Sequence, residues 1–199
     1  MIPSARRKLP GVAYYLAAPA LAAILFHRAF HTWFLADDFA WLGLRFQVHR
    51  ASDLQHVLFS PQAQGTIRFL SERLFFLVFF SLFGLNALPF RIFVFATWCA
   101  DLTLAAIVGA RLTGSRAAGL LAAILWTSSA ALARPLAWAS SYNEVMFALC
   151  VLMAFYARLR WIDDRRRRWI AIEWIAYLAG FGALELIVVY PALALLHAL

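Results

Sequence analysis

The chain has 199 residues, of which 64% are hydrophobic and 14% are charged, and its formal net charge is +8. Apolar residues in such long, uniform runs exclude an ordinary soluble fold and leave no room for a separate soluble domain. The positive residues form short clusters between the apolar runs, as in proteins that charge orients in a membrane, so they do not indicate a nucleic-acid partner. The sequence therefore predicts one transmembrane domain over residues 1–199.

The first apolar run follows the basic residues Arg6–Lys8 and continues into His27 and Arg28 without a small-residue cleavage site, so we interpret it as a retained span. A helix needs about 20 mostly apolar residues to cross the hydrocarbon layer. The last run is interrupted by glycine, Glu185 and Pro191, and makes one kinked span or one span and the start of another. We predict an all-α integral membrane protein with about five to six transmembrane helices. The runs are roughly Gly11–Phe30, Phe90–Ala110, Ala117–Ala133, Glu144–Tyr156 with its flank, and Ile170–Leu199.

The stretch Phe69–Leu85 has a short apolar core, LFFLVFFSLFGL, which suits an interfacial or re-entrant helix better than a crossing. If this helix does not cross, the basic segments all lie on one side of the membrane. The positive-inside tendency favours that arrangement and predicts a cytoplasmic N-terminus in an inner or plasma membrane. It places Ala36–Pro89 and Arg134–Asn143 together outside the cytoplasm. The basic segments hold 11 of the 18 Lys and Arg residues and are Arg6–Lys8, Arg111–Arg116 and Arg158–Arg168.

Two adjacent carboxylates, Asp37 and Asp38, directly follow the first span. In one interpretation Asp37 caps a surface helix from Asp38 to about Val48, because aspartate is a favoured cap. In the other, the pair is catalytic. The two external stretches also offer anion-binding groups and further carboxylates, although an arginine beside an apolar helix commonly extends to the interface for solvation alone. These groups are Arg68, Glu72, Arg73, Arg91, Arg134, Asn143 and Glu144.

Other polar residues lie within the apolar runs. His27 and His31 have the spacing of a two-histidine metal site, but no third ligand is evident nearby. Asp101 lies near the middle of a span, where pairing or protonation is the simpler explanation and a functional role the alternative. Cys99 and Cys150 are expected to act as small hydrophobic residues.

The order of the polar motifs along the chain is informative. An acidic pair opens the first external loop, and a juxtamembrane helix ends in a Leu-Phe-Gly turn. An arginine opens the next span, a basic turn follows, and a small-residue span ends in a Pro-containing external loop before a late acidic residue. The motifs are Asp37-Asp38, Arg68-Phe69-Leu70, Leu82-Phe83-Gly84-Leu85-Asn86, Arg91, Arg111–Arg116, Arg134-Pro135-Leu136-Ala137-Trp138, and Glu185 with Pro191.

This order resembles the GT-C superfamily of glycosyltransferases, which includes protein O-mannosyltransferases and lipid A aminoarabinose transferases. The resemblance implies a GT-C-like fold, with residues 1–199 as the N-terminal portion of a longer module. It implies transfer of a sugar from a polyprenyl-phosphate donor to an unidentified acceptor hydroxyl at the external membrane face. Two motifs depart from the pattern: Arg68-Phe69-Leu70 stands where many relatives have Arg-Pro-Pro-Leu, and Leu184-Glu185 where Lys-Glu is common.

The resemblance also implies site residues. Asp37 or Asp38 is the expected catalytic base, and because adjacent helical residues point about 100° apart, only one can serve; we favour Asp37. Arg68 and Arg91 are expected to bind the leaving phosphate. No cofactor is certain, a divalent metal is kept as an option, and the expected partners are the lipid-linked sugar and membrane lipids. The full expected substrate-binding set is Arg68, Arg91, Arg134, Asn143, Glu144 and Glu185.

Two other functions are kept as alternatives. A transporter or flippase-like protein would use Asp101 and Glu185 to carry protons or ions, with carboxylates converging near the middle of the membrane. A non-catalytic membrane scaffold would lack a common cavity for Asp37, Arg68 and Arg91.

Overall fold

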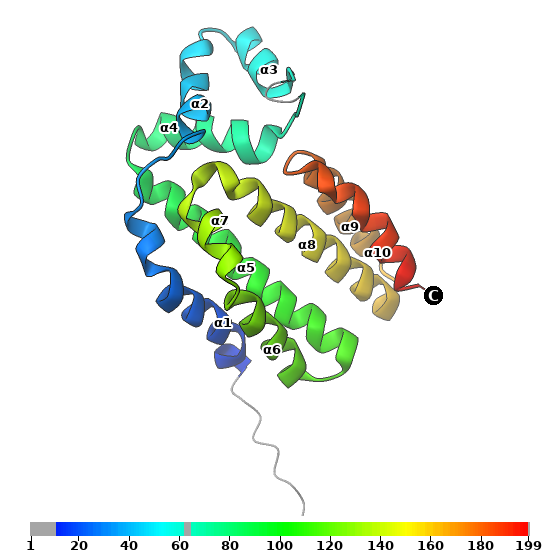
Figure 1. Cartoon of the computed structure of the whole chain (residues 1–199). Coiled ribbons are helices and arrows are strands. Elements are labelled where there is room, and N and C mark those ends of the chain that lie inside the picture. Colours follow the sequence, from blue (N-terminus) through cyan, green and yellow to red (C-terminus); the bar gives the residue numbers. More distant parts are fainter. Residues whose placement is uncertain (1–10, 62–64, 199) are drawn as a thin grey trace, which may run out of the picture.

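The computed structural model describes residues 11–61 and 65–198, which fold into helices joined by short connections (Figure 1). The α-helices are α1 (Gly11–Phe26), α2 (Asp38–Gly43), α3 (Ala51–Phe59), α4 (Phe75–Phe83), α5 (Ala87–Thr113), α6 (Arg116–Thr127), α7 (Ala133–Ala137), α8 (Tyr142–Asp164), α9 (Arg167–Phe181) and α10 (Tyr190–Leu196). The 3₁₀-helices are η1 (His27–His31), η2 (Leu44–Gln47), η4 (Ala130–Leu132), η5 (Ala139–Ser141) and η6 (Glu185–Val189), and η3 (Phe69–Leu74) is a π-helix.

Three helical segments of the described residues are long and apolar enough to cross a membrane: Gly11–His31, Ala87–Thr113 and Ala139–Asp164. A fourth candidate span is the pair Arg116–Thr127 and Ala130–Ala137, which together are long and apolar enough but are bent by 58°. The bend follows Ser128, whose hydroxyl donates to the Ile124 carbonyl at 2.9 Å, a back-bond that often bends helices. The expectation of an all-helical membrane protein is thus confirmed, with three or four candidate spans.

The final apolar region forms two short helical pieces instead of one long span. Helix α9 has 15 residues, and the helical stretch Glu185–Leu196 is also shorter than a full crossing. The chain turns between them at Gly182 and Ala183, where the peptide N–H groups bond back to Ala179 and Gly180. The interrupted sequence therefore produces a break, as its glycines indicated.

Helix α5 is the central helix of the bundle, and α1, α6 and α8 pack against it (Figure 1). Gly119 allows the close approach of α6, because a Cβ atom there would lie 2.2 Å from the Ala106 carbonyl oxygen. Small residues at helix contacts serve this purpose in membrane bundles. On the same helix pair, the buried indole of Trp98 meets the half-buried indole of Trp126 edge to face, with 4.4 Å between the ring centroids.

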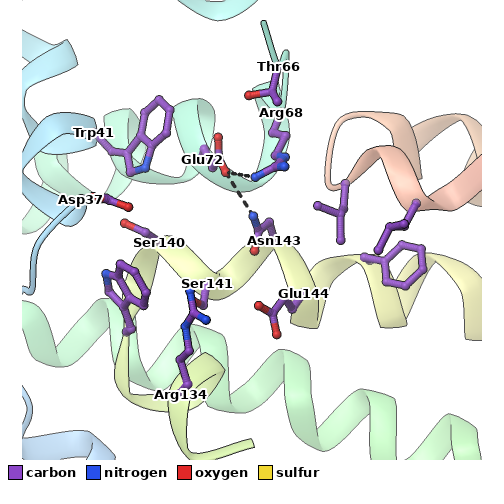
Figure 2. A pocket seen from close by; sticks show the side chains of 14 residues that line it. Asp37, Trp41, Thr66, Arg68, Glu72, Arg134, Ser140, Ser141, Asn143 and Glu144 are labelled. Carbon is purple, nitrogen blue, oxygen red and sulfur yellow. Dashed lines mark hydrogen bonds and ion pairs between the residues drawn. The ribbon is translucent and has the colours of Figure 1, made fainter. Parts of the chain in front are cut away.

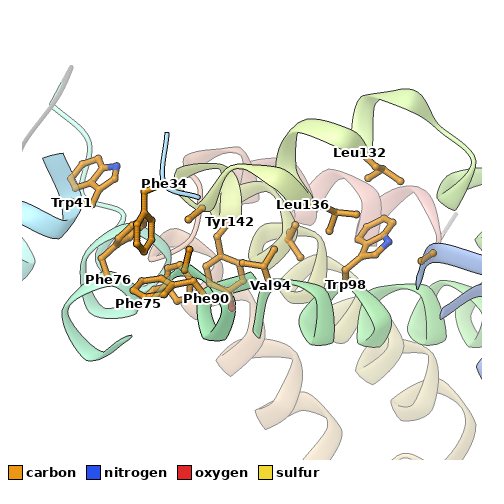
Figure 3. Packing of buried hydrophobic residues seen from close by; sticks show 14 of the residues in the cluster. Phe34, Trp41, Phe75, Phe76, Phe90, Val94, Trp98, Leu132, Leu136 and Tyr142 are labelled. Carbon is orange, nitrogen blue, oxygen red and sulfur yellow. The ribbon is translucent and has the colours of Figure 1, made fainter. Parts of the chain in front are cut away.

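Helices α2, α3 and α4 form a cap across one end of this bundle (Figure 1). The apolar core continues from the bundle into the cap without interruption (Figure 3). Phe75 of α4 links the two, since its ring lies between 4.5 and 5.9 Å from five aromatic rings. Those rings belong to Phe76, Phe79, Phe90, Phe93 and Tyr142.

The stretch Phe69–Leu85 is a π-helix followed by the nine-residue α4, and it does not meet the length for a membrane span. It lies across the end of the bundle (Figure 1). Its depth relative to lipid stays a prediction.

The opposite end of the bundle, which we call the basic end, is formed by residues 111–116 and 158–168 with the start of α1. Arg111 makes an ion pair with Asp163, so the two arginine-rich segments lie side by side as expected. The segment Arg6–Lys8 lies outside the described residues, and the cytoplasmic placement of this end stays a prediction.

Candidate functional site

A cavity of about 640 Å³ lies between the cap and the bundle (Figure 2). Its walls come from α2, the segment around η3, the loop before α8, the first turns of α8, and the segment after α9. Acidic, basic, amide, hydroxyl and indole groups share these walls. The lining residues are Asp37, Trp41, Thr66, Arg68, Glu72, Arg134, Trp138, Ser140, Ser141, Asn143, Glu144, Phe147, Leu184 and Leu186.

The acidic pair divides into one buried and one exposed carboxylate. Asp38 is fully buried, and its Oδ1 accepts from the N–H and hydroxyl of Ser140 at 2.7 and 2.6 Å. Its Oδ2 accepts from the Leu35 N–H at 2.9 Å and lies 3.8 Å from the Arg91 guanidinium. These contacts make Asp38 a structural carboxylate that fixes the loop before α8 against α2.

Asp37 is exposed and lines the cavity. It occupies the N-cap position of α2, yet its side chain makes no capping hydrogen bond. The preceding Ala36 has φ 41°, a left-handed conformation that costs an alanine roughly 1 kcal/mol or more. This turn leaves the carboxylate of Asp37 facing the cavity, as Figure 2 shows. The capping interpretation of Asp37 is therefore not supported by the geometry.

A charged network forms the second wall of the cavity. Arg68 bonds to Glu72 at 2.9 Å and to Glu185 at 3.0 Å, and Asn143 donates to the same Glu72 oxygen at 3.1 Å. Burial raises the pKa of Glu72 above its ordinary value, even though the bonds from Arg68 and Asn143 act in the opposite direction. Burial lowers the pKa of Arg68, but the bonds to both carboxylates outweigh it and the net shift is upward. Two glutamates therefore largely neutralise this arginine.

Arg134 stands on the third wall and is exposed. Its guanidinium lies over the Trp138 ring at 4.7 Å, and no carboxylate within the described part of the chain makes an ion pair with it. Glu144 also faces this cavity from the first turn of α8 (Figure 2). The cavity thus contains an arginine that forms no ion pair with any carboxylate of residues 11–61 and 65–198.

Arg91 does not share the cavity. It is 1% exposed, donates to the carbonyls of Thr32 and Trp33 at 3.1 and 2.8 Å, and lies beside Asp38. This position does not suit the expected role of Arg91 in binding substrate phosphate. The guanidinium is buried, and it already donates to carbonyls of the loop after η1. Glu185 lies at the rim, joined to the cavity through Arg68.

Comparison of the chain with known protein families, curated proteins and solved structures gave no match. Six residues singled out from the sequence line the cavity, from three separate parts of the chain, namely Asp37, Arg68, Glu72, Arg134, Asn143 and Glu144.

Sequence reasoning missed Ser140, Ser141 and Trp41. Ser141 with Glu144 has the Ser-x-x-Glu spacing of a capping box, which could have drawn attention to the start of α8. In the structure the Ser141 side chain makes no capping bond and instead faces the cavity. Ser140 and Trp41 gave no local signal, because their roles depend on contacts distant in sequence.

A metal role for His27 and His31 gains no support from the geometry. The Nδ1 atom of His27 lies 3.0 Å from the Ile24 carbonyl oxygen of its own helix. Within residues 11–61 and 65–198, no group of three or more His, Cys, Asp or Glu side chains could hold a metal ion.

Proposed function

We propose that this chain is the donor-binding part of a membrane glycosyltransferase that moves a sugar from a polyprenyl-phosphate donor to an acceptor hydroxyl. The proposal rests on the order of motifs described above and on one structural observation. An exposed carboxylate, Asp37, and an arginine with no ion-pair partner among the described residues, Arg134, line the same cavity at one end of the candidate membrane spans.

Asp37 is the proposed base. A carboxylate that accepts a proton from the acceptor hydroxyl, as the anomeric carbon–oxygen bond to phosphate breaks, accelerates such a step by about 10²–10⁴-fold. The proton moves to Asp37, the new glycosidic bond forms, and the lipid phosphate leaves as an anion. Asp38 cannot take this role in the present geometry, because both of its oxygens are engaged and it is fully buried.

Arg134 is the proposed ligand of the leaving phosphate. An arginine can bind two phosphate oxygens with paired donors, and such charge-assisted bonds stabilise negative charge as it develops. Arg68 contributes less free charge because Glu72 and Glu185 neutralise it, so it serves mainly to position the wall of the cavity. The indoles of Trp41 and Trp138 offer flat apolar surfaces for the donor.

The GT-C-like architecture with five to six spans belongs to this proposal. It would require α9 and the broken stretch after it to supply the remaining crossings, although each is short. A transporter function is less well supported. Asp101 is buried in α5 without a hydrogen-bond partner among the described residues, whereas Glu185 pairs with Arg68 at the cap. These two carboxylates therefore do not converge.

The test compares Asp37→Asn with Asp38→Asn in membranes containing the full-length protein, using a panel of radiolabelled polyprenyl-phosphate sugars. The Asp37 side chain is exposed and makes no capping hydrogen bond, so Asp37→Asn should remain folded and bind donor while transfer slows by about 10²–10⁴-fold. Wild-type transfer in Asp37→Asn would exclude Asp37 as the base, and loss confined to an Asp38→Asn protein that is still folded and binds donor would move the base to Asp38. Wild-type transfer in both variants would exclude catalysis by this pair.

A further inference from the structure

A second cavity, of about 450 Å³, lies at the basic end, at the opposite end of the bundle from the candidate site. It is bounded by the start of α1, the turn between α5 and α6, and the last turns of α8. Three arginines and three tyrosines contribute to its lining, namely Tyr14, Tyr15, Arg111, Arg116, Tyr156 and Arg160.

The positive charge around this cavity exceeds the negative charge. Residues 111–116 and 158–168 contain eight arginines and two aspartates. The two aspartates already have partners: Asp163 pairs with Arg111, and Asp164 lies 3.7 Å from Arg160. Arg116 is exposed and makes no ion pair with any described carboxylate. An anion in the cavity would therefore meet uncompensated charge.

The remaining groups around the cavity are also suited to an anion. The Nε atom of Arg160 is buried and has no hydrogen-bond partner in the described part of the chain. Helix α6 begins at Arg116, so the positive end of its dipole lies at the same place. Guanidinium groups match the oxygens of a phosphate more closely than an ammonium group does.

The location favours a phosphate ester carried at a membrane surface. The cavity lies at the ends of α1, α5 and α8, which belong to the three segments able to cross a membrane. Basic pockets between such helices bind anionic lipid headgroups in membrane proteins. A volume of about 450 Å³ also leaves room for more than a bare phosphate ion.

We propose that the cavity at the basic end binds a phosphate group, as an anionic lipid headgroup presents it, and that Arg116 is a direct ligand. This site is separate from the candidate catalytic cavity and does not depend on the proposed transferase activity.

The experiment measures thermal unfolding of the purified full chain in uncharged detergent micelles by tryptophan fluorescence. The probes are short-chain phosphatidylglycerol, short-chain phosphatidylcholine, and inorganic phosphate against chloride at matched ionic strength. Phosphatidylglycerol should raise the unfolding midpoint in a saturable manner, and phosphatidylcholine should not. A rise with inorganic phosphate as well would identify the phosphate group itself as the ligand. A rise with phosphatidylglycerol alone would identify the lipid headgroup as its source.

The decisive variant is Arg116→Gln, with Arg167→Gln as its matched control. Arg167 lies in the other basic segment of the same end of the bundle and is exposed, but it does not line the cavity. Arg116→Gln should weaken phosphatidylglycerol binding on the order of tenfold, whereas Arg167→Gln should change it less than about twofold. Arg116→Lys keeps the charge and should restore only part of the affinity. Equal losses in Arg116→Gln and Arg167→Gln, or equal effects of the two lipids together with no effect of inorganic phosphate, would overturn the proposal.

Discussion

The carboxylate of Asp38 accepts hydrogen bonds from the N–H and the hydroxyl of Ser140, although 102 residues separate the two positions. This contact joins the cap to the loop that precedes α8. It also determines which of the two adjacent aspartates is available to the cavity, because Asp38 is enclosed and Asp37 remains exposed.

Replacing Asp38 should lower stability. Asp38→Asn removes the negative charge beside Arg91 and one of the two carboxylate acceptors, so we expect a loss of about 1.5–3 kcal/mol in the free energy of unfolding. Denaturant unfolding in detergent measures this loss in the free energy of unfolding. Asp53→Asn is the control: Asp53, in the first turn of α3, accepts from the N–H groups of His49 and Arg50 near the surface, where solvent can replace these bonds, so a smaller loss than in Asp38→Asn is expected. Equal effects of the two substitutions would contradict the structural role of Asp38.

Replacing Arg134 should weaken donor binding more than it affects folding. Arg134→Ala removes an exposed guanidinium from the cavity, and loss of a charge-assisted contact to phosphate should raise the apparent KM for the lipid-phosphate donor by about 10- to 100-fold. Arg134→Lys should recover part of this loss. Arg28→Ala, at an exposed position that does not line the cavity, serves as the control. An unchanged KM in Arg134→Ala would remove Arg134 from the donor site.

Glu72 should make stability depend on pH. Burial raises its pKa in the folded state, so the folded protein binds this proton more tightly than the unfolded chain does. The stabilisation from Glu72 is complete below the ordinary glutamate pKa and is lost as pH rises through the raised pKa.

Glu72→Gln removes this titration, so the variant should gain stability relative to the wild type as pH increases through that window. A pH series of unfolding midpoints for both proteins measures the difference. Glu144→Gln, at an exposed carboxylate of the same cavity, is the control. A pH-independent difference between the wild type and Glu72→Gln would show that the burial of Glu72 has no energetic effect.

Gly119 should tolerate no side chain. A Cβ atom there would also lie 2.6 Å from the Ala110 nitrogen, so Gly119→Ala forces α6 away from α5. We expect a loss of about 1–3 kcal/mol, measured by unfolding in detergent, as for other overpacked sites. Gly43→Ala is the control, because a Cβ atom at Gly43 has no neighbour within 4 Å. Equal stability of the two variants would contradict the tight contact of α5 with α6.

The long spans could be predicted from the sequence because continuous apolar runs dictate them locally. The expected Phe90–Ala110 lies within α5, and Glu144–Tyr156 lies within α8. The bend after Ser128 within Ala117–Ala133 could not be predicted, because it depends on a serine back-bond and on tertiary packing.

The candidate site was predictable to the level of loops but not of individual side chains. The sequence predicted that the two polar stretches lie on the same side of the membrane. In the structure, Asp37, Arg68 and Arg134 from these stretches line one cavity. Arg91 lies outside this cavity because its guanidinium donates to the carbonyls of Thr32 and Trp33, almost 60 residues earlier. A contact so distant in sequence leaves no local pattern from which it could be predicted.

The segment after α9 is attached to η3 and Arg68 at two places, which differ in strength. At its base, Leu70 donates to the Gly182 carbonyl at 2.9 Å, and the buried Ser71 hydroxyl donates to the Ala183 carbonyl at 2.8 Å. Farther along the same segment, Glu185 forms an ion pair with Arg68. The side chain of Glu185 is 52% exposed. Exposed pairs of this kind contribute about 0–1 kcal/mol to stability, so the Arg68–Glu185 contact should break more readily than the hydrogen bonds at Gly182 and Ala183. The segment next to α9 is therefore held firmly where it meets η3 and only weakly where Glu185 meets Arg68.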